Sequence, residues 1–171
     1  MLDLYTVAGI IHSESPNVRS NQATIKTNAG AINGHYTLGE KLSKHSNAGA
    51  IDIQVVMDTT HPSPSATFET KANAGLTNVH LLSPLGHRRQ LASQHSSIAG
   101  SVNVVYPEEW EGVVEGSTMV GSLVMNGNGL RIVDSRGGFI NHYQRAVKGD
   151  FAGKGSANLT TTTGAVFFSL Q

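Results

Sequence analysis

The feature that most constrains this chain is a short segment, Asn-Ala-Gly followed by alternating apolar residues, which the sequence contains three times. It occurs as TNAGAING, SNAGAIDI and ANAGLTNV, and related segments such as SIAGSVNV and TMVGSLVM follow. Most of the marked glycines are 19 to 26 residues apart, and the last two are 43 apart, close to two periods. Self-similarity at this period is typical of solenoids. The marked glycines are Gly9, Gly30, Gly49, Gly75, Gly100, Gly121 and Gly164.

Apolar and polar residues alternate after each glycine. The residues two and four positions later are mostly Ile, Val, Leu, Met or Phe, and the residue between them is usually polar. This period of two predicts a strand with one buried face. No single unit can bury that face alone, so we expect the units to stack in parallel and to fill one interior. Ile32, Ile51 and Val102 should then share a column.

The glycines themselves indicate a sharp corner before each strand, because glycine adopts positive φ without the Cβ penalty. We therefore predict structural turns at the six best-marked glycines, from Gly30 to Gly164. Two polar ladders should follow from the stacking, because amides in one column can hydrogen-bond along the axis. The first ladder is Asn28, Asn47 and Asn73, and the second is Asn33, Asp52, Asn78 and Asn103.

The sequence predicts an all-β, single-domain parallel β-solenoid over residues 1–171, with about 7–8 rungs. We expect a right-handed coil, as for parallel crossover connections. Residues 1–24 form a weak first rung or cap, and 57–70 and 83–95 leave the stack as loops. A degenerate rung is expected in RIVDSRGGFINHYQ (131–144).

Composition limits the range of partners. Lys and Arg number 12 and so do Asp and Glu, so no net charge attracts the chain to nucleic acid or to an anionic membrane. The chain has no Cys, which excludes disulfides and thiolate metal sites. No segment has the roughly 20 apolar residues that a transmembrane helix needs. The N-terminus lacks the pattern of a secretory signal, so we expect any export signal or anchor to lie outside this chain.

The series TNAGAING, SNAGAIDI and SIAGSVNVVYPEEWEGVVEGSTMVGSL resembles the adhesin domains of fungal cell-surface proteins, a family of unknown function. The run Tyr106–Ser122, the later LRIV and AVKG segments and the closing glycine unit have the same order as in that family, so the similarity extends from about Thr24 to the end. The resemblance implies a parallel β-solenoid outside a fungal cell, often following a membrane anchor. It implies no catalytic residues. The missing anchor and the poor first unit depart from the family pattern.

Few residues suggest chemistry. The eight His have no spacing typical of a helical metal site, and we expect them on the surface or in loops. Trp110, with Glu109 and Glu111, is the best candidate for a glycan contact, because an exposed ring could stack on a sugar beside carboxylates. The alternative is that Trp110 packs on the neighbouring rung. Thr27, Thr118 and Thr161 share a column position, which raises the hypothesis of an ice-binding row.

We predict a non-enzymatic, extracellular, adhesin-like structural protein without cofactor or metal. The final segment AVFFSLQ (165–171) is apolar and lacks a charged cap, so the solenoid ends are expected to pair with further copies and to form filaments. A cell-wall glycan or another surface protein is the other expected partner. The alternative function is a polysaccharide-binding or polysaccharide-cleaving β-helix acting through Trp110 and nearby acids.

Overall fold

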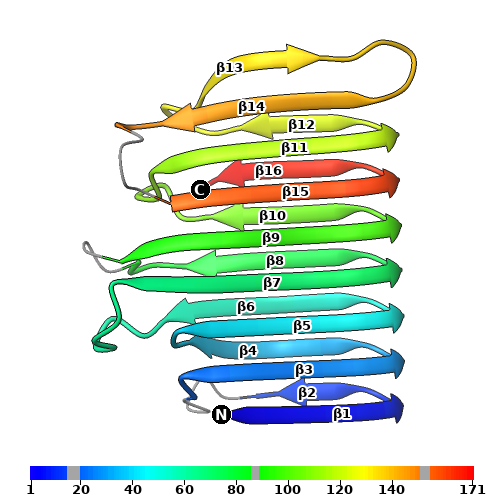
Figure 1. Cartoon of the computed structure of the whole chain (residues 1–171), viewed down its shortest axis with the longest axis vertical. Helices are drawn as coiled ribbons and strands as arrows, with labels where there is room; N and C mark the ends of the chain where they lie inside the picture. Colours follow the sequence, from blue (N-terminus) through cyan, green and yellow to red (C-terminus); the bar gives the residue numbers. More distant parts are fainter. Residues whose placement is uncertain (15–19, 86–88, 151–154) are drawn as a thin grey trace.

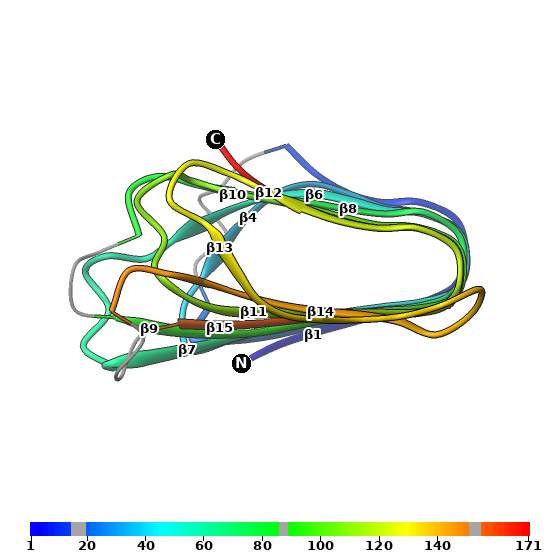
Figure 2. The same ribbon diagram turned by 90° about the horizontal axis from the view of Figure 1, so that it is seen from above.

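The computed structural model describes residues 1–14, 20–85, 89–150 and 155–171. In these residues the chain is all-β and forms two sheets made mostly of parallel strands. The sheets lie face to face and are joined at one side by a column of tight corners (Figure 2). The described residues contain no helix that could cross a membrane.

The first sheet has nine strands. In spatial order they are β1 (Leu2–Ala8), β3 (Gln22–Ala29), β5 (Lys41–Ala48), β7 (Ser65–Ala74), β9 (Gln90–Ala99), β15 (Gly155–Thr163), β11 (Gly112–Val120), β14 (His142–Lys148) and β13 (Arg131–Arg136). The second sheet has seven strands. Their spatial order is β12 (Leu123–Asn126), β16 (Val166–Leu170), β10 (Val102–Tyr106), β8 (Thr77–Leu82), β6 (Ile51–Met57), β4 (Ile32–Leu38) and β2 (Ile11–Ser13).

Each strand of the second sheet directly follows a strand of the first sheet across a glycine corner, and we call such a pair a rung (Figure 1). Neighbouring rungs pair in register in both sheets. Ile32 lies beside Ile51, and Val102 occupies the same column two rungs further along. These three side chains are fully buried, which confirms the predicted shared interior.

The corner glycines stack directly on one another. Gly75 has φ +128°, and a Cβ added to it would overlap the carbonyl group of Gly49 in the neighbouring rung. The same overlap would occur at each of the predicted corners from Gly30 to Gly164, whereas Gly9 has positive φ but open space where its Cβ would lie. Glycine is therefore required at the inner corners for two reasons, the backbone angle and the close approach of the next rung.

The order of the rungs in space differs from their order in the chain. The C-terminal rung, β15 and β16, lies between the β9–β10 rung and the β11–β12 rung (Figure 1). Strand β15 pairs in parallel with β9 on one side and with β11 on the other. The expectation that AVFFSLQ forms an open end is therefore wrong, because β16 is hydrogen-bonded between β10 and β12.

Residues 131–144 do not form a degenerate rung. Strands β13 and β14 both lie in the first sheet and pair antiparallel with each other, and β14 also pairs antiparallel with β11. Seen from above, β13 crosses over the space between the two sheets (Figure 2). The two strands thus form a hairpin that covers one end of the stack, which explains why the last two marked glycines are two periods apart.

The two predicted loop excursions are shorter than expected. Strand β6 continues to Met57 and β7 begins at Ser65, while β9 begins at Gln90. The second half of each predicted loop is therefore paired strand. Residues 86–88 and 15–19, parts of the second excursion and of the weak first rung, lie outside the described residues. Arg89 fixes the first loop, because its guanidinium donates to the carbonyl oxygens of Asp58 (2.9 Å) and Gly39 (2.7 Å).

The corner geometry predicts unequal effects of one substitution at two glycines. We expect Gly75→Ala to lower the free energy of unfolding by more than about 3 kcal/mol, because it adds steric overlap to backbone strain. Gly9→Ala should cost only about 1–2 kcal/mol, the strain alone. Urea unfolding of both variants measures the difference. Equal losses would show that the close approach of the rungs contributes nothing.

Candidate functional site

Trp110, the predicted glycan contact, is buried. Its side chain is 2% exposed and packs edge-on against Tyr106, with ring centroids 5.6 Å apart, and against Phe168 at 5.7 Å. Phe168 belongs to the inserted C-terminal rung. The hypothesis of an exposed ring that stacks on a sugar is therefore wrong, because the aromatic cluster joins the inserted rung to its neighbour. The alternative, packing on a neighbouring rung, is confirmed.

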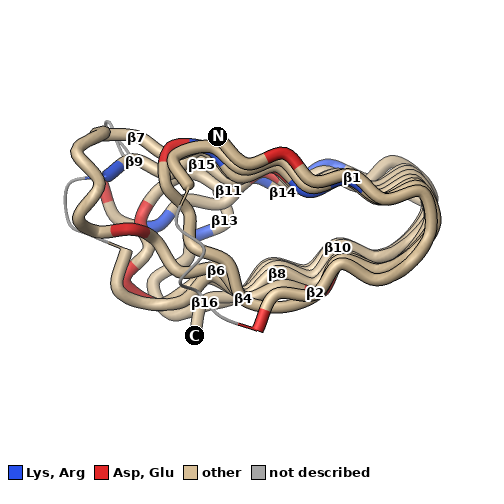
Figure 3. The backbone as a smooth tube through the Cα atoms, turned by 90° about the horizontal axis from the view of Figure 1, so that it is seen from below, with Lys and Arg blue, Asp and Glu red and all other residues tan. Residues whose placement is uncertain are grey.

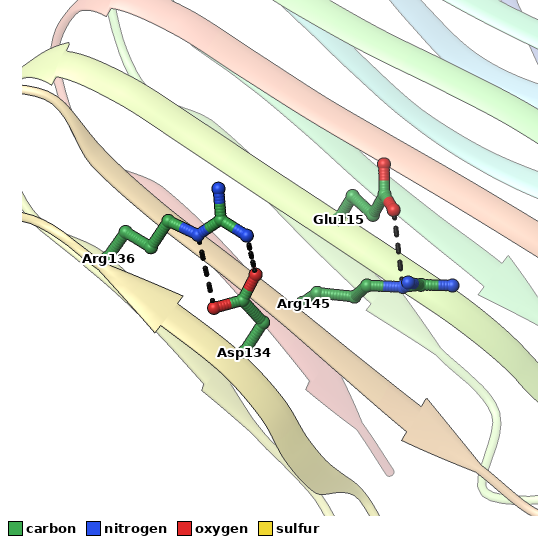
Figure 4. Close-up of polar contacts among 4 residues, drawn as sticks. All are labelled: Glu115, Asp134, Arg136 and Arg145. Carbon is green, nitrogen blue, oxygen red and sulfur yellow. Dashed lines mark hydrogen bonds and ion pairs between the residues drawn. The ribbon is translucent and has the colours of Figure 1, made fainter.

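Three carboxylates near Trp110 each have a separate partner. Glu109 accepts a hydrogen bond from the backbone N–H of Leu85 at 2.7 Å, and the Glu111 carboxyl group lies against Gly149. Glu115 forms an ion pair with Arg145 of β14 at 3.3 Å (Figure 4). Each of these acids thus contacts a different segment of the chain.

The first predicted ladder occupies the outer surface of the first sheet. Asn47 Nδ2 donates to Asn28 Oδ1 at 2.8 Å, and Asn73 Nδ2 donates to Asn47 Oδ1 at 3.1 Å. All three side chains are exposed. The amides therefore form a continuous row across three rungs, in which each side chain retains polar atoms that face solvent.

The second predicted ladder lies on the outer surface of the second sheet. Asn33 pairs in register with Asp52, Asp52 with Asn78, and Asn78 with Asn103. The next residues in that column are Phe167 and Val124, so the polar row ends where the inserted rung begins. In this column, four polar side chains lie on successive rungs, and two apolar side chains, Phe167 and Val124, follow them.

The predicted threonine row faces inward. Thr27, Thr118 and Thr161 are 3%, 2% and 6% exposed. The hydroxyl groups of Thr118 and Thr161 donate to the carbonyl oxygens of Gly164 (3.0 Å) and Gly100 (2.9 Å) in the neighbouring rungs. The ice-binding hypothesis for these residues is wrong, because all three side chains are buried inside the stack and cannot meet an ice surface.

One histidine is part of the core, contrary to the expectation that the histidines lie on the surface or in loops. His95 is fully buried, with Nδ1 2.8 Å from the Thr70 hydroxyl and Nε2 3.1 Å from the Tyr106 hydroxyl. The Tyr106 hydroxyl in turn donates to Ser93 at 2.7 Å. Burial lowers the pKa of His95 to about 3, so the ring is neutral near pH 7. This network satisfies buried polar groups and has no open side.

A lysine also lies in the core, and only its position in the strand alternation could have indicated this from the sequence. Lys44 is fully buried, and its Nζ lies 3.0 Å from the centre of the Tyr36 ring. That Nζ has no hydrogen-bond partner within the described residues. Burial lowers the pKa of Lys44 to about 6.

The described residues contain no group of three or more His, Asp or Glu placed to hold a metal ion. Comparisons with protein-family models, with curated proteins and with solved structures find no match to this chain. The resemblance to fungal adhesin domains therefore stays an expectation.

Replacing Trp110 tests its packing role. We expect Trp110→Ala to lower the free energy of unfolding by about 3–5 kcal/mol, because it removes a buried aromatic side chain and leaves a cavity. Phe139→Ala, at a fully exposed aromatic, should change it by less than about 0.5 kcal/mol. Denaturant unfolding measures both. A Trp110→Ala protein as stable as the parent would contradict the assignment.

Lys44 makes stability depend on pH. Its folded pKa lies below the unfolded value, so the unfolded chain binds more protons and stability rises as the pH increases from about 6 toward 10.5. Below pH 6 the penalty is fully present. We expect Lys44→Met to remove this slope and to stabilise the protein at pH 7 by a few kcal/mol, at about 1.4 kcal/mol per pKa unit. Urea unfolding at pH 7, 8 and 9 tests this, because His95, whose pKa burial also lowers, adds its own slope below about pH 6.5.

Lys41→Met, at an exposed lysine of the same strand, provides the control and should leave the slope unchanged. If the Lys44→Met variant keeps the parent's dependence of stability on pH, the interpretation that the buried Lys44 amine is neutral is wrong.

Proposed function

We propose that this chain is a parallel β-solenoid with a non-catalytic, structural role, and that it associates with a second copy through its open β1–β2 end. The stacking of seven rungs in register and the column of corner glycines support the solenoid. The burial of Trp110 and the separate engagement of the nearby acids support a non-catalytic role over the polysaccharide-cleaving alternative. An extracellular, adhesin-like setting is what the family resemblance implies.

The single observation that carries the association proposal is the uncovered interior at β1. Leu4 pairs in register with Ile25, so both occupy the same inward column. Ile25, which a rung covers on each side, is 1% exposed, whereas Leu4 is 41% exposed. Strand β1 also lies at the edge of its sheet, and an edge strand offers unpaired backbone groups to another chain.

Two further features of this end favour a partner. An open hollow of about 500 Å³ lies beside β1, and a partner could contact Met1 and Leu2 together with its polar residues Ser20, Asn21, Thr37 and Asp58. Ile10, at the corner between β1 and β2, is 70% exposed. Covering Leu4 and Ile10 removes apolar surface from water, at about 25 cal/mol per Å².

A second copy docked end to end in a symmetric pair fits this geometry better than an open filament. A head-to-tail filament needs a parallel rung at each end. The other end instead has the β13–β14 hairpin, which adds two strands to the first sheet and none to the second, so the two sheets do not end level there as they do at β1 and β2. Two β1 strands related by a two-fold axis would pair antiparallel, and such an interface closes after two copies. The proposed assembly is therefore a dimer.

The association is tested by placing a charge at each end. The parent protein should show a concentration-dependent mass that reaches a dimer in analytical ultracentrifugation. Leu4→Lys should weaken dimerisation tenfold or more, because it puts a charge in the centre of the interface. Ile132→Lys, at a 48% exposed position on β13, should leave it unchanged. Circular dichroism and thermal unfolding confirm that both variants are folded.

A strict monomer at high concentration would overturn the proposal. A loss of association in both variants would indicate head-to-tail filaments through both ends. Association that only Ile132→Lys abolishes would place the interface at the hairpin.

A further inference from the structure

The segment Asn158-Leu159-Thr160 of β15 has the Asn-x-Ser/Thr pattern of an N-glycosylation acceptor. It is the only such segment in the sequence, because no other asparagine is followed two residues later by Ser or Thr. A three-residue pattern is short, so the position of the segment in the fold decides whether a glycan can be carried there. The acceptor amide must lie on the surface, with room beside it for a bulky group.

Strand alternation places the two acceptor residues outward. Asn158 and Thr160 are two positions apart and therefore point to the same side of β15, while Leu159 between them is fully buried. Asn158 is exposed, and its side-chain amide has no hydrogen-bond partner among the residues that the structure describes. The Nδ2 atom of Asn158 is thus open to substitution without the loss of an internal contact.

The side chains before and after Asn158 along the strands are short. On the outer surface, register places Ala92 beside Ser156 and Ser96 beside Thr160. A group attached to Nδ2 of Asn158 can therefore lie over the sheet in the strand direction without meeting a long side chain.

Two longer side chains flank Asn158 across the strands. Gln94 of β9 and Glu115 of β11 are in register with it, and Glu115 is held by Arg145 of β14 at 3.3 Å. An open hollow of about 190 Å³ lies beside Asn158 toward β9, and its other outward side chains are Thr67, Glu69, Ala92 and Gln94. The first sugar of a glycan therefore has space on this surface.

Charged residues are sparse in this part of the sheet. Strands β9 and β15 contain no Lys, Arg, Asp or Glu. Figure 3 marks the charged positions along the stack, and the bend that holds the glycine corners has none. A glycan at Asn158 would add polar bulk to a region where charge does not provide it.

The place of β15 in the chain indicates when a glycan can be added. In the folded protein, the backbone of Asn158 and Thr160 is paired with β9 on one side and β11 on the other, so an enzyme cannot bind this segment as a separate peptide. Strand β15 follows both neighbours in the sequence. Its acceptor segment therefore stays unpaired until the C-terminal rung inserts.

We propose that Asn158 is the attachment site of an N-linked glycan, which is added before β15 inserts and is displayed on the outer surface afterwards. In the transfer, Nδ2 of Asn158 forms a bond to C1 of the sugar and loses one proton. The C1–O bond to the pyrophosphate of a lipid-linked oligosaccharide breaks, and the lipid pyrophosphate leaves with the electron pair. The inference rests on the extracellular setting of the proposed function, because secreted chains are the ones that carry this modification.

The test expresses the chain with a fused secretion signal in a eukaryotic host and locates the modification by mass spectrometry. The parent should carry one N-glycan, at Asn158. Asn158→Gln and Thr160→Ala should each abolish it, whereas Thr160→Ser, which keeps the hydroxyl group, should retain it. Asn126→Gln, at an exposed asparagine outside the pattern, is the control and should be modified as the parent is. Circular dichroism confirms that the variants are folded.

The timing is tested by a pulse-chase experiment with an inhibitor of lipid-linked oligosaccharide synthesis. Chains made and folded during the block should stay unmodified after the inhibitor is removed, while chains made later should be modified. Modification of the chains that had already folded would overturn the proposed order of events.

A secreted parent without a glycan, or a glycan that Asn158→Gln retains, would overturn the proposal. Because the secretion signal is supplied, the result does not depend on the native export route. Analytical ultracentrifugation separates this inference from the association at β1. A parent that dimerises without a glycan would leave the association standing, and a modified parent that is strictly monomeric would leave the Asn158 site standing.

Discussion

The close approach of backbones at the glycine corners is the constraint on which the rest of the structure depends. At each inner corner, a carbonyl group of the neighbouring rung occupies the position that a side chain would need. Because the corners stack without offset, the two strands that leave each corner meet their neighbours in register in both sheets. The hydrogen-bond ladders and the buried columns follow from that single alignment.

In-register stacking converts sequence positions into rows. Inward rows collect Ile, Val and Phe, but the same rule also places Lys44 and His95 in the core, where they are tolerated through a ring face and through hydroxyl partners. Outward rows bring together side chains from separate rungs, as in the amide row from Asn28 to Asn73. Side chains on the outer surfaces of the sheets are therefore arranged in rows along the stack.

The inserted C-terminal rung decides which end of the stack is free. Phe168 reaches Tyr106 and Trp110, and the Thr161 hydroxyl donates to the Gly100 carbonyl, so the last rung contacts the β9–β10 rung closely. The β11–β12 rung, earlier in the chain, lies further out and is followed by the hairpin. One end thus carries the antiparallel hairpin, with β13 as the edge strand, while the β1–β2 end has a parallel rung at its edge.

The sequence by itself determined the structure of the single rung, two strands joined at a glycine corner. Its glycine spacing and its alternation of apolar and polar residues predicted the corners, the Ile32–Ile51–Val102 column and the amide row, because these features depend only on local period and on register. Tertiary structure alone decided the order of the rungs, the burial of Trp110 and the position of the free end. Every rung presents similar edges to its neighbours, so the repeat cannot specify which rung follows which. That choice depends on aromatic and hydroxyl contacts between residues far apart in the chain, such as Tyr106 with Phe168 and Thr161 with Gly100.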